Sequence, residues 1–149
     1  MDKKISLDLA HQTYLISIPA GLHQSLFSSV FAKDRLLKQL AQDKQICLYG
    51  YCLFEHSIHL LLETQEKPSV WIEPFLMEFN QWHQATTGDS GYLFNDSGIA
   101  RLLVQPKFSP VALRYLHQLP VLQRKCGVAP QYLYTSYHDY LQENPVSSL

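Results

Sequence analysis

Two histidines lie close together near the middle of the chain, where imidazole nitrogens are able to bind a divalent cation. His56 falls in a short polar break, and His59 falls in the apolar run that follows it. Side chains alternate between the two faces of a strand, so Ser57 and His59 share a face and His56 points the other way unless a bulge re-aims it. Two structural alternatives stay open: His59 as a hydrogen-bonded core or edge histidine, and His56 as a turn residue.

Basic residues gather late in the chain, where they are candidates for contacts with the phosphates of a nucleic acid. An ordinary solvated face is the alternative interpretation. The whole chain holds 12 Lys and Arg against 13 Asp and Glu, and this net charge of −1 does not by itself favour nucleic-acid binding. Any binding of DNA is therefore expected to be modest and strongly dependent on salt. The candidates are Arg101, Lys107, Arg114, Arg124 and Lys125.

Length and composition predict one globular domain over residues 1–149. The hydrophobic share of 46% supplies a core and excludes a disordered chain. The apolar stretches are too short for a transmembrane helix, and the first residues are too polar for a signal peptide. Three cysteines without Cys-x-x-Cys spacing, Cys47, Cys52 and Cys126, argue against a disulfide framework or zinc site and predict a reducing cytoplasm.

The elements that must position these residues are predicted in the order β-α-β-β-α-β-α. A break at 55–57 is too short for a crossover, so the strands on either side of it must pair as an antiparallel hairpin. This order predicts an α+β protein with a ferredoxin-like antiparallel sheet and helices packed on it. Strands are expected at 13–18, 45–54, 58–63 and 99–104, helices at 34–41, 68–86 and 109–120, and a helical or turn-rich tail at 132–141.

Aromatic residues in two of the predicted helices indicate core packing. Trp71, Phe75, Phe79 and Trp82 recur at helical spacing, which is typical of a buried face rather than a base-stacking surface. Tyr115 lies on the apolar face of the later helix, where a core tyrosine is the ordinary interpretation.

Four stretches, in order along nearly the whole chain, resemble the single-tyrosine HUH transposases, of the REP-associated and insertion-sequence type. In that family the hairpin reads roughly Tyr-Cys-Leu-Met-Pro-Asn-His-Val-His-Leu-Leu-Leu, and residues 51–62 match it. Residues 115–121 match the family's Tyr-Ile-His-x-Asn-Pro-Val. Residues 79–94 follow its Phe-Asn, Gly and aromatic spacing, and residues 134–141 are similar to its Trp-Ser-Ser-Tyr-x-x-Tyr-Leu ending.

The resemblance implies cleavage and transfer of single-stranded DNA. Tyr115 would be the nucleophile that forms a 5′-phosphotyrosine link. His59 would be a ligand of a Mg²⁺ or Mn²⁺ ion that polarises the phosphate as a Lewis acid. The two residues are expected to open onto one shared cleft. The implied partner is single-stranded or hairpin DNA, and a homodimer is a candidate assembly.

Two departures from the family pattern affect the implied metal site. Ser57 stands where the family has the first histidine of its pair, and Leu119 stands where the family has a polar ligand one turn after the tyrosine. His56 and Gln118 are further candidate ligands. The sequence therefore predicts a DNA-binding protein of this family whose catalysis and metal binding are weak or lost. The alternative is an inactive regulatory or protein-interaction module on the same fold.

Overall fold

The computed structural model describes residues 8–21, 30–88 and 91–143, apart from the side chains of residues 130 and 141–143. Four strands form one antiparallel sheet in the order β2-β3-β1-β4, which is the ferredoxin-like arrangement, so the predicted fold class is confirmed. The strands are β1 (Thr13–Pro19), β2 (Ile46–Leu53), β3 (Ser57–Thr64) and β4 (Ala100–Val104). The helices are α1 (Val30–Gln42), α2 (Pro68–Thr87), α3 (Ser109–Leu122) and the short α4 (Tyr137–Glu143).

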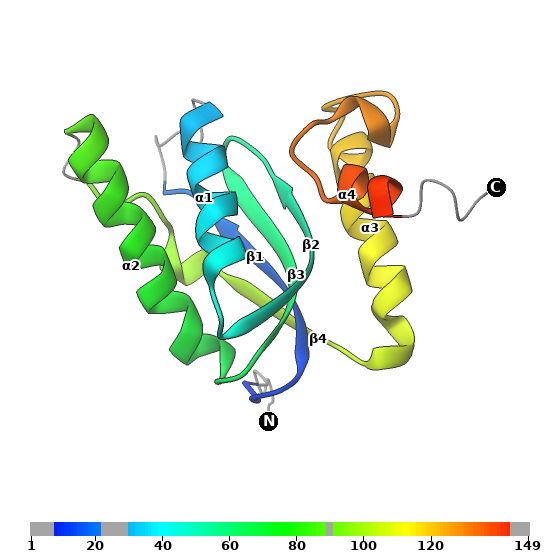
Figure 1. Cartoon of the computed structure of the whole chain (residues 1–149), viewed down its shortest axis with the longest axis horizontal. Helices are drawn as coiled ribbons and strands as arrows, with labels where there is room; N and C mark the ends of the chain where they lie inside the picture. Colours follow the sequence, from blue (N-terminus) through cyan, green and yellow to red (C-terminus); the bar gives the residue numbers. More distant parts are fainter. Residues whose placement is uncertain (1–7, 22–29, 89–90, 144–149) are drawn as a thin grey trace.

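Helices cover both faces of the sheet (Figure 1). α1 and α2 lie on one face, where Tyr14, Ile16 and Ile18 of β1 are fully buried in the larger core. α3 and α4 lie on the other face, where Leu15 packs on a smaller core that includes Leu116 of α3. Because strand residues alternate, each strand of this sheet contributes to both cores.

Helix α2 carries the aromatic residues that the sequence assigned to the core. Trp71, Phe75 and Phe79 are buried, and Trp82 is half-buried against the same cluster. The helix ends at Gly88, whose left-handed backbone (φ 82°) lets its N–H bond the carbonyl of Gln84. The core interpretation of these aromatics is confirmed.

Two helix boundaries differ from the predicted ones. α1 begins at Val30 rather than at residue 34. The sequence pattern missed this first turn because Val30 and Phe31 are apolar but 59% and 80% exposed, so they do not follow the amphipathic period. α3 continues past Pro120 to Leu122, since a proline in the last turn removes only one N–H from the helix. In the part of the chain described, no helix is both long and apolar enough to cross a bilayer.

Candidate nucleic-acid interface

His59 lies on the face of the sheet that α3 covers. It stands opposite Cys52 of β2 on one side and opposite Ser17 of β1 on the other. Ile58 and Leu60, its neighbours in β3, point into the core beneath α1 and α2. The predicted alternation therefore holds, and Ser57 shares the α3 side with His59.

Both ring nitrogens of His59 are hydrogen-bonded to serine hydroxyls. The Nδ1 atom lies 3.0 Å from Ser17 Oγ, and the Nε2 atom lies 3.0 Å from Ser57 Oγ. The ring of Phe54 packs edge-on against the imidazole, with 5.5 Å between ring centroids. Burial lowers the pKa of His59 to about 4, so the ring is neutral at physiological pH. A neutral imidazole has one donor and one acceptor nitrogen, and the two hydroxyls satisfy both.

This donor set does not fit the divalent cation of the transposase family. A hard cation needs several oxygen or nitrogen ligands in a fixed geometry, whereas His59 already uses both nitrogens. His56 lies exposed in the hairpin turn, with its Nε2 atom 4.0 Å from a carboxylate oxygen of Glu55. Gln118 is exposed on α3, and Leu119 is buried in the smaller core. Across the described residues no three His, Cys, Asp or Glu side chains come together as metal ligands.

Tyr115 is 47% exposed on α3 and lines an apolar groove of about 590 Å³. Leu15 of β1 and Leu102 of β4, which face each other in the sheet, form part of its floor. His59 is on the same side of the sheet but is not among the residues that line this groove. The structure therefore brings Tyr115 and His59 to one side of the sheet without joining them in one groove, and their common role stays a prediction.

The groove exists because one helix covers only half of this face. α3 packs mainly on β2 and β3, which form one half of the sheet. A helix is about 10 Å wide, whereas four strands at a spacing of about 4.8 Å extend further. The apolar side chains of β1 and β4 on this face are left beside α3 rather than beneath it.

Four of the five predicted basic residues belong to α3 or its flanking turns. Lys107 places its Nζ atom 5.1 Å from the ring centroid of Phe108, and Lys125 places its Nζ atom 6.0 Å from that of Phe54. Arg114 and Arg124 are exposed, Arg124 in a left-handed backbone conformation (φ 60°) just after the helix.

Arg101 is separated from the other four. In β4 it alternates with Leu102 and lines a pocket with Ile72 of α2, on the opposite face of the sheet. Its Nη1 atom lies 3.1 Å from Oδ1 of Asp8. Arg101 therefore takes part in an ion pair on the α2 side, away from the surface formed by α3.

The distribution of charge along the chain was a signal that the net charge concealed. Between Asp96 and Asp139 the sequence holds five Lys and Arg residues and no Asp or Glu. Helix α2, in contrast, carries Glu73 and Glu78 and no Lys or Arg. Four of the five basic residues lie on α3 or in its flanking turns, and Glu63 of β3 and Asp139 of α4 lie on the same side of the molecule. A chain of net charge −1 thus concentrates its basic residues near α3, as phosphate binding requires.

The histidine of the Tyr-Leu-His motif has a structural role that the motif did not reveal. His117 is buried, and its Nε2 atom lies 2.7 Å from Oγ of Ser136, which also accepts the backbone N–H of Tyr51 at 2.9 Å. The rings of Tyr137 and Tyr140 pack edge-on against the imidazole at 5.7 and 5.4 Å between centroids. Residues 115–121 and 134–141, two of the four motif stretches, therefore contact each other. These contacts hold the end of the described chain against β2 and α3.

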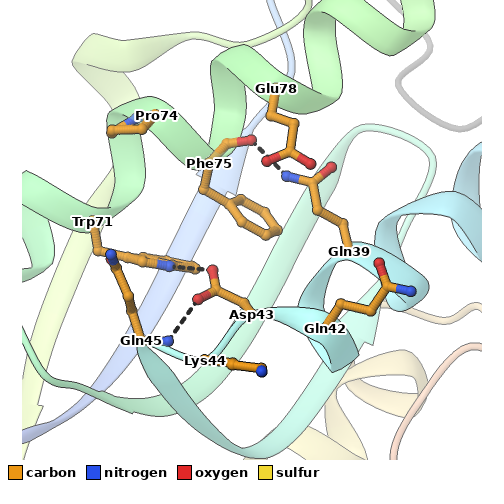
Figure 2. A pocket seen from close by; sticks show the side chains of 9 residues that line it. All are labelled: Gln39, Gln42, Asp43, Lys44, Gln45, Trp71, Pro74, Phe75 and Glu78. Atoms are coloured by element: carbon orange, nitrogen blue, oxygen red, sulfur yellow. Dashed lines mark hydrogen bonds between the residues drawn. The ribbon is translucent and has the colours of Figure 1, made fainter.

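A second hollow of about 500 Å³ lies on the other side of the molecule, between α1, α2 and the start of β2 (Figure 2). The indole N–H of Trp71 donates to Asp43 Oδ2 at 2.7 Å, and the backbone N–H of Gln45 donates to Asp43 Oδ1 at 2.8 Å. The Gln39 amide donates to the carbonyl of Phe75 at 2.8 Å. These bonds join α1 to α2 and join α2 to the turn that leads into β2, so we interpret this hollow as a structural contact between these elements.

Comparison with known proteins finds a similar fold but no similar sequence. Neither a family model nor a curated protein matches the chain. A solved structure of a REP-associated tyrosine transposase bound to a REP hairpin has a TM-score of 0.71 and 9% sequence identity, covering 93% of this chain and 84% of that chain. At this identity the likeness shows a shared fold, of the kind that the four sequence stretches also indicate.

Proposed function

We propose that this chain binds single-stranded or hairpin DNA through the side of the molecule that α3 forms, without metal-dependent strand cleavage. The observation that carries the proposal is the concentration of basic residues there, on a fold shared with a protein solved on a DNA hairpin. Lys107, Arg114, Arg124 and Lys125 supply charges that neutralise phosphates, and no acidic residue stands between them in the sequence.

The chemistry around His59 supports binding without cleavage. Its two nitrogens are taken by Ser17 and Ser57, and Leu119 offers no donor where the family has a polar ligand. Cleavage through a metal-polarised phosphate needs ligands that these residues do not supply. Tyr115, being half-exposed in an apolar groove, is left with a binding role.

Fluorescence anisotropy with labelled single-stranded, hairpin and duplex oligonucleotides tests the proposal. Four phosphate contacts on a single strand predict that log K falls with log salt with a slope of about −3. The variant Lys107→Glu/Arg114→Glu should weaken binding more than tenfold. Its matched control, Lys38→Glu/Lys44→Glu, makes the same charge change with Lys38 on α1 and should keep most of the affinity. Equal losses in the two variants would contradict an α3 interface.

Denaturing gels test the absence of cleavage. A hairpin labelled at either end, incubated with the protein and Mn²⁺, should yield neither a shortened strand nor a covalent protein–DNA adduct. An adduct that disappears in Tyr115→Phe would show that the residues around His59 are sufficient for catalysis and would refute this part of the proposal.

A further inference from the structure

Large apolar side chains surround the groove beside α3 and remain open to solvent. Leu102, Phe108, Val111 and Tyr115 are 62%, 51%, 63% and 47% exposed and line the same groove. Single exposed apolar residues are ordinary, but a contiguous group around a hollow marks a binding surface. The described part of the chain leaves this group uncovered.

Each aromatic residue of the groove directly follows a basic one. Lys107 precedes Phe108, and Arg114 precedes Tyr115, so the two pairs are seven residues apart, about two helical turns. No acidic residue lies in this stretch. Lys107 lies beside the groove, with its Nζ atom 5.1 Å from the ring centroid of Phe108, and Arg114 is exposed on the helix that carries Tyr115. Positive charge thus borders the ring faces, which suits a ligand that carries both flat apolar rings and negative charge.

A second copy of the chain fits this surface poorly. A symmetric contact through α3 would bring Lys107 and Arg114 of one copy toward the same residues of the other, and like charges facing each other oppose association. A nucleic-acid strand has the complementary chemistry, because phosphates alternate with base rings along it.

Resting on the function proposed above, we infer that this groove holds an unpaired nucleobase of the bound strand. The base stacks on Phe108 and Tyr115, while Lys107 and Arg114 hold the neighbouring phosphates. In a duplex the base faces are hidden by stacking, so only single-stranded or looped DNA uses the groove. Tyr115 acts here through its ring, and its hydroxyl is not required.

Aromatic replacements test the inference with an unstructured single-stranded oligonucleotide and its duplex as probes. Phe108→Ala or Tyr115→Ala should weaken single-strand binding about five- to a hundredfold, the usual range for the loss of one stacked base. Tyr115→Phe should restore most of the affinity that Tyr115→Ala loses. Phe31→Ala removes an equally large ring, 80% exposed on α1, and should leave the affinity unchanged. A 2-aminopurine placed in the single strand should lose fluorescence on binding, and less so with Phe108→Ala.

The outcomes separate this inference from the proposed function. If the alanine variants keep full affinity while Lys107→Glu/Arg114→Glu loses it, the strand binds here without using the groove, and only the inference is overturned. If neither oligonucleotide binds the wild-type chain, the proposed function itself fails. A Tyr115→Phe variant as weak as Tyr115→Ala would show that the hydroxyl matters and would overturn the stacking role. Sedimentation showing a dimer that Val111→Glu dissociates would assign the groove to a second copy instead.

Discussion

The two faces of the sheet are closed to different degrees. Beneath α1 and α2, seventeen buried residues form one core cluster, whereas six form the cluster beneath α3, counted over the described residues. Both α1 and α2 lie over the first face, whereas on the second face α3 packs mainly on β2 and β3, and the short α4 packs against α3. Most of the buried apolar surface therefore lies on the first face, which stabilises the fold. The second face leaves apolar and basic side chains available for a ligand.

The largest effect expected from this comparison is on the free energy of unfolding. Phe79 is fully buried on the α1/α2 face, so Phe79→Ala should cost about 3–5 kcal/mol. Phe108→Ala removes the same ring from the open α3 side and should stay within about 0.5 kcal/mol of the wild type. Urea unfolding followed by circular dichroism measures both. Comparable losses would mean that Phe108 belongs to a core and not to a binding surface.

The sequence predicted the closed face better than the open one, for a physical reason. Local patterns such as the short break at 55–57 and the aromatic period of α2 determine which elements form and which faces they bury. The surroundings of His59 depend instead on Ser17, which lies 42 residues away and reaches the imidazole only through the register of β1 on β3.

Arg101 illustrates the same limit within a single strand. It was grouped with Lys107 and Arg114 because the three are close in sequence. Strand alternation, however, points Arg101 to the α2 face and its neighbour Leu102 to the α3 face. Period-2 patterns tell which residues share a face. Which helix covers that face follows only from the assembled sheet.

A second expected effect concerns pH and comes from the α3 side. The pKa of His59 is lowered to about 4 in the folded protein, against about 6.5 in an unfolded chain, so protons bind the unfolded state more readily. The free energy of unfolding should therefore fall by about 2–3 kcal/mol as the pH drops from about 6.5 to 4. In His59→Gln this loss should be clearly smaller, with the remainder due in part to His117, whose pKa is also lowered by burial.

Urea unfolding at several pH values between 7.5 and 4 provides the measurement. His56→Gln is the matched control, because it makes the same replacement at an exposed histidine in the adjacent turn. An unchanged slope in His59→Gln would indicate that the imidazole is not held neutral between its two serines.

A third effect tests how closely α3 approaches the sheet. A Cβ atom at Gly50 of β2 would lie 2.7 Å from a methyl carbon of Leu113 and 3.0 Å from one of Leu116. Both contacts are with side-chain ends that are able to shift partly, so Gly50→Ala should cost about 1–2 kcal/mol. Gly127→Ala, in the exposed turn after α3, meets no atom closer than 3.5 Å and should change stability little. Equal stabilities would mean that α3 sits further from β2.

The smallest expected effect bears on metal binding at the α3 side. Ser57→His places a second imidazole on the face that carries His59 and removes the hydroxyl that bonds Nε2. Two neutral imidazoles offer Mn²⁺ two nitrogen ligands, where the wild type offers one imidazole and a hydroxyl. We expect Mn²⁺ affinity at least tenfold above that of the wild type, about 1.4 kcal/mol, in isothermal titration calorimetry.

Ser57→Ala separates the two changes that the histidine variant makes, because it frees His59 Nε2 without adding a ligand. If the second imidazole is what matters, Ser57→Ala should bind Mn²⁺ no better than the wild type. A wild-type chain that already binds as tightly as Ser57→His would show that other residues build the metal site. A folded Ser57→His variant with no gain would show that positions 57 and 59, although they share a face, lack the further ligands and space that a hard cation needs. Either result would leave the hydrogen bonds of His59 as a purely structural feature of the sheet.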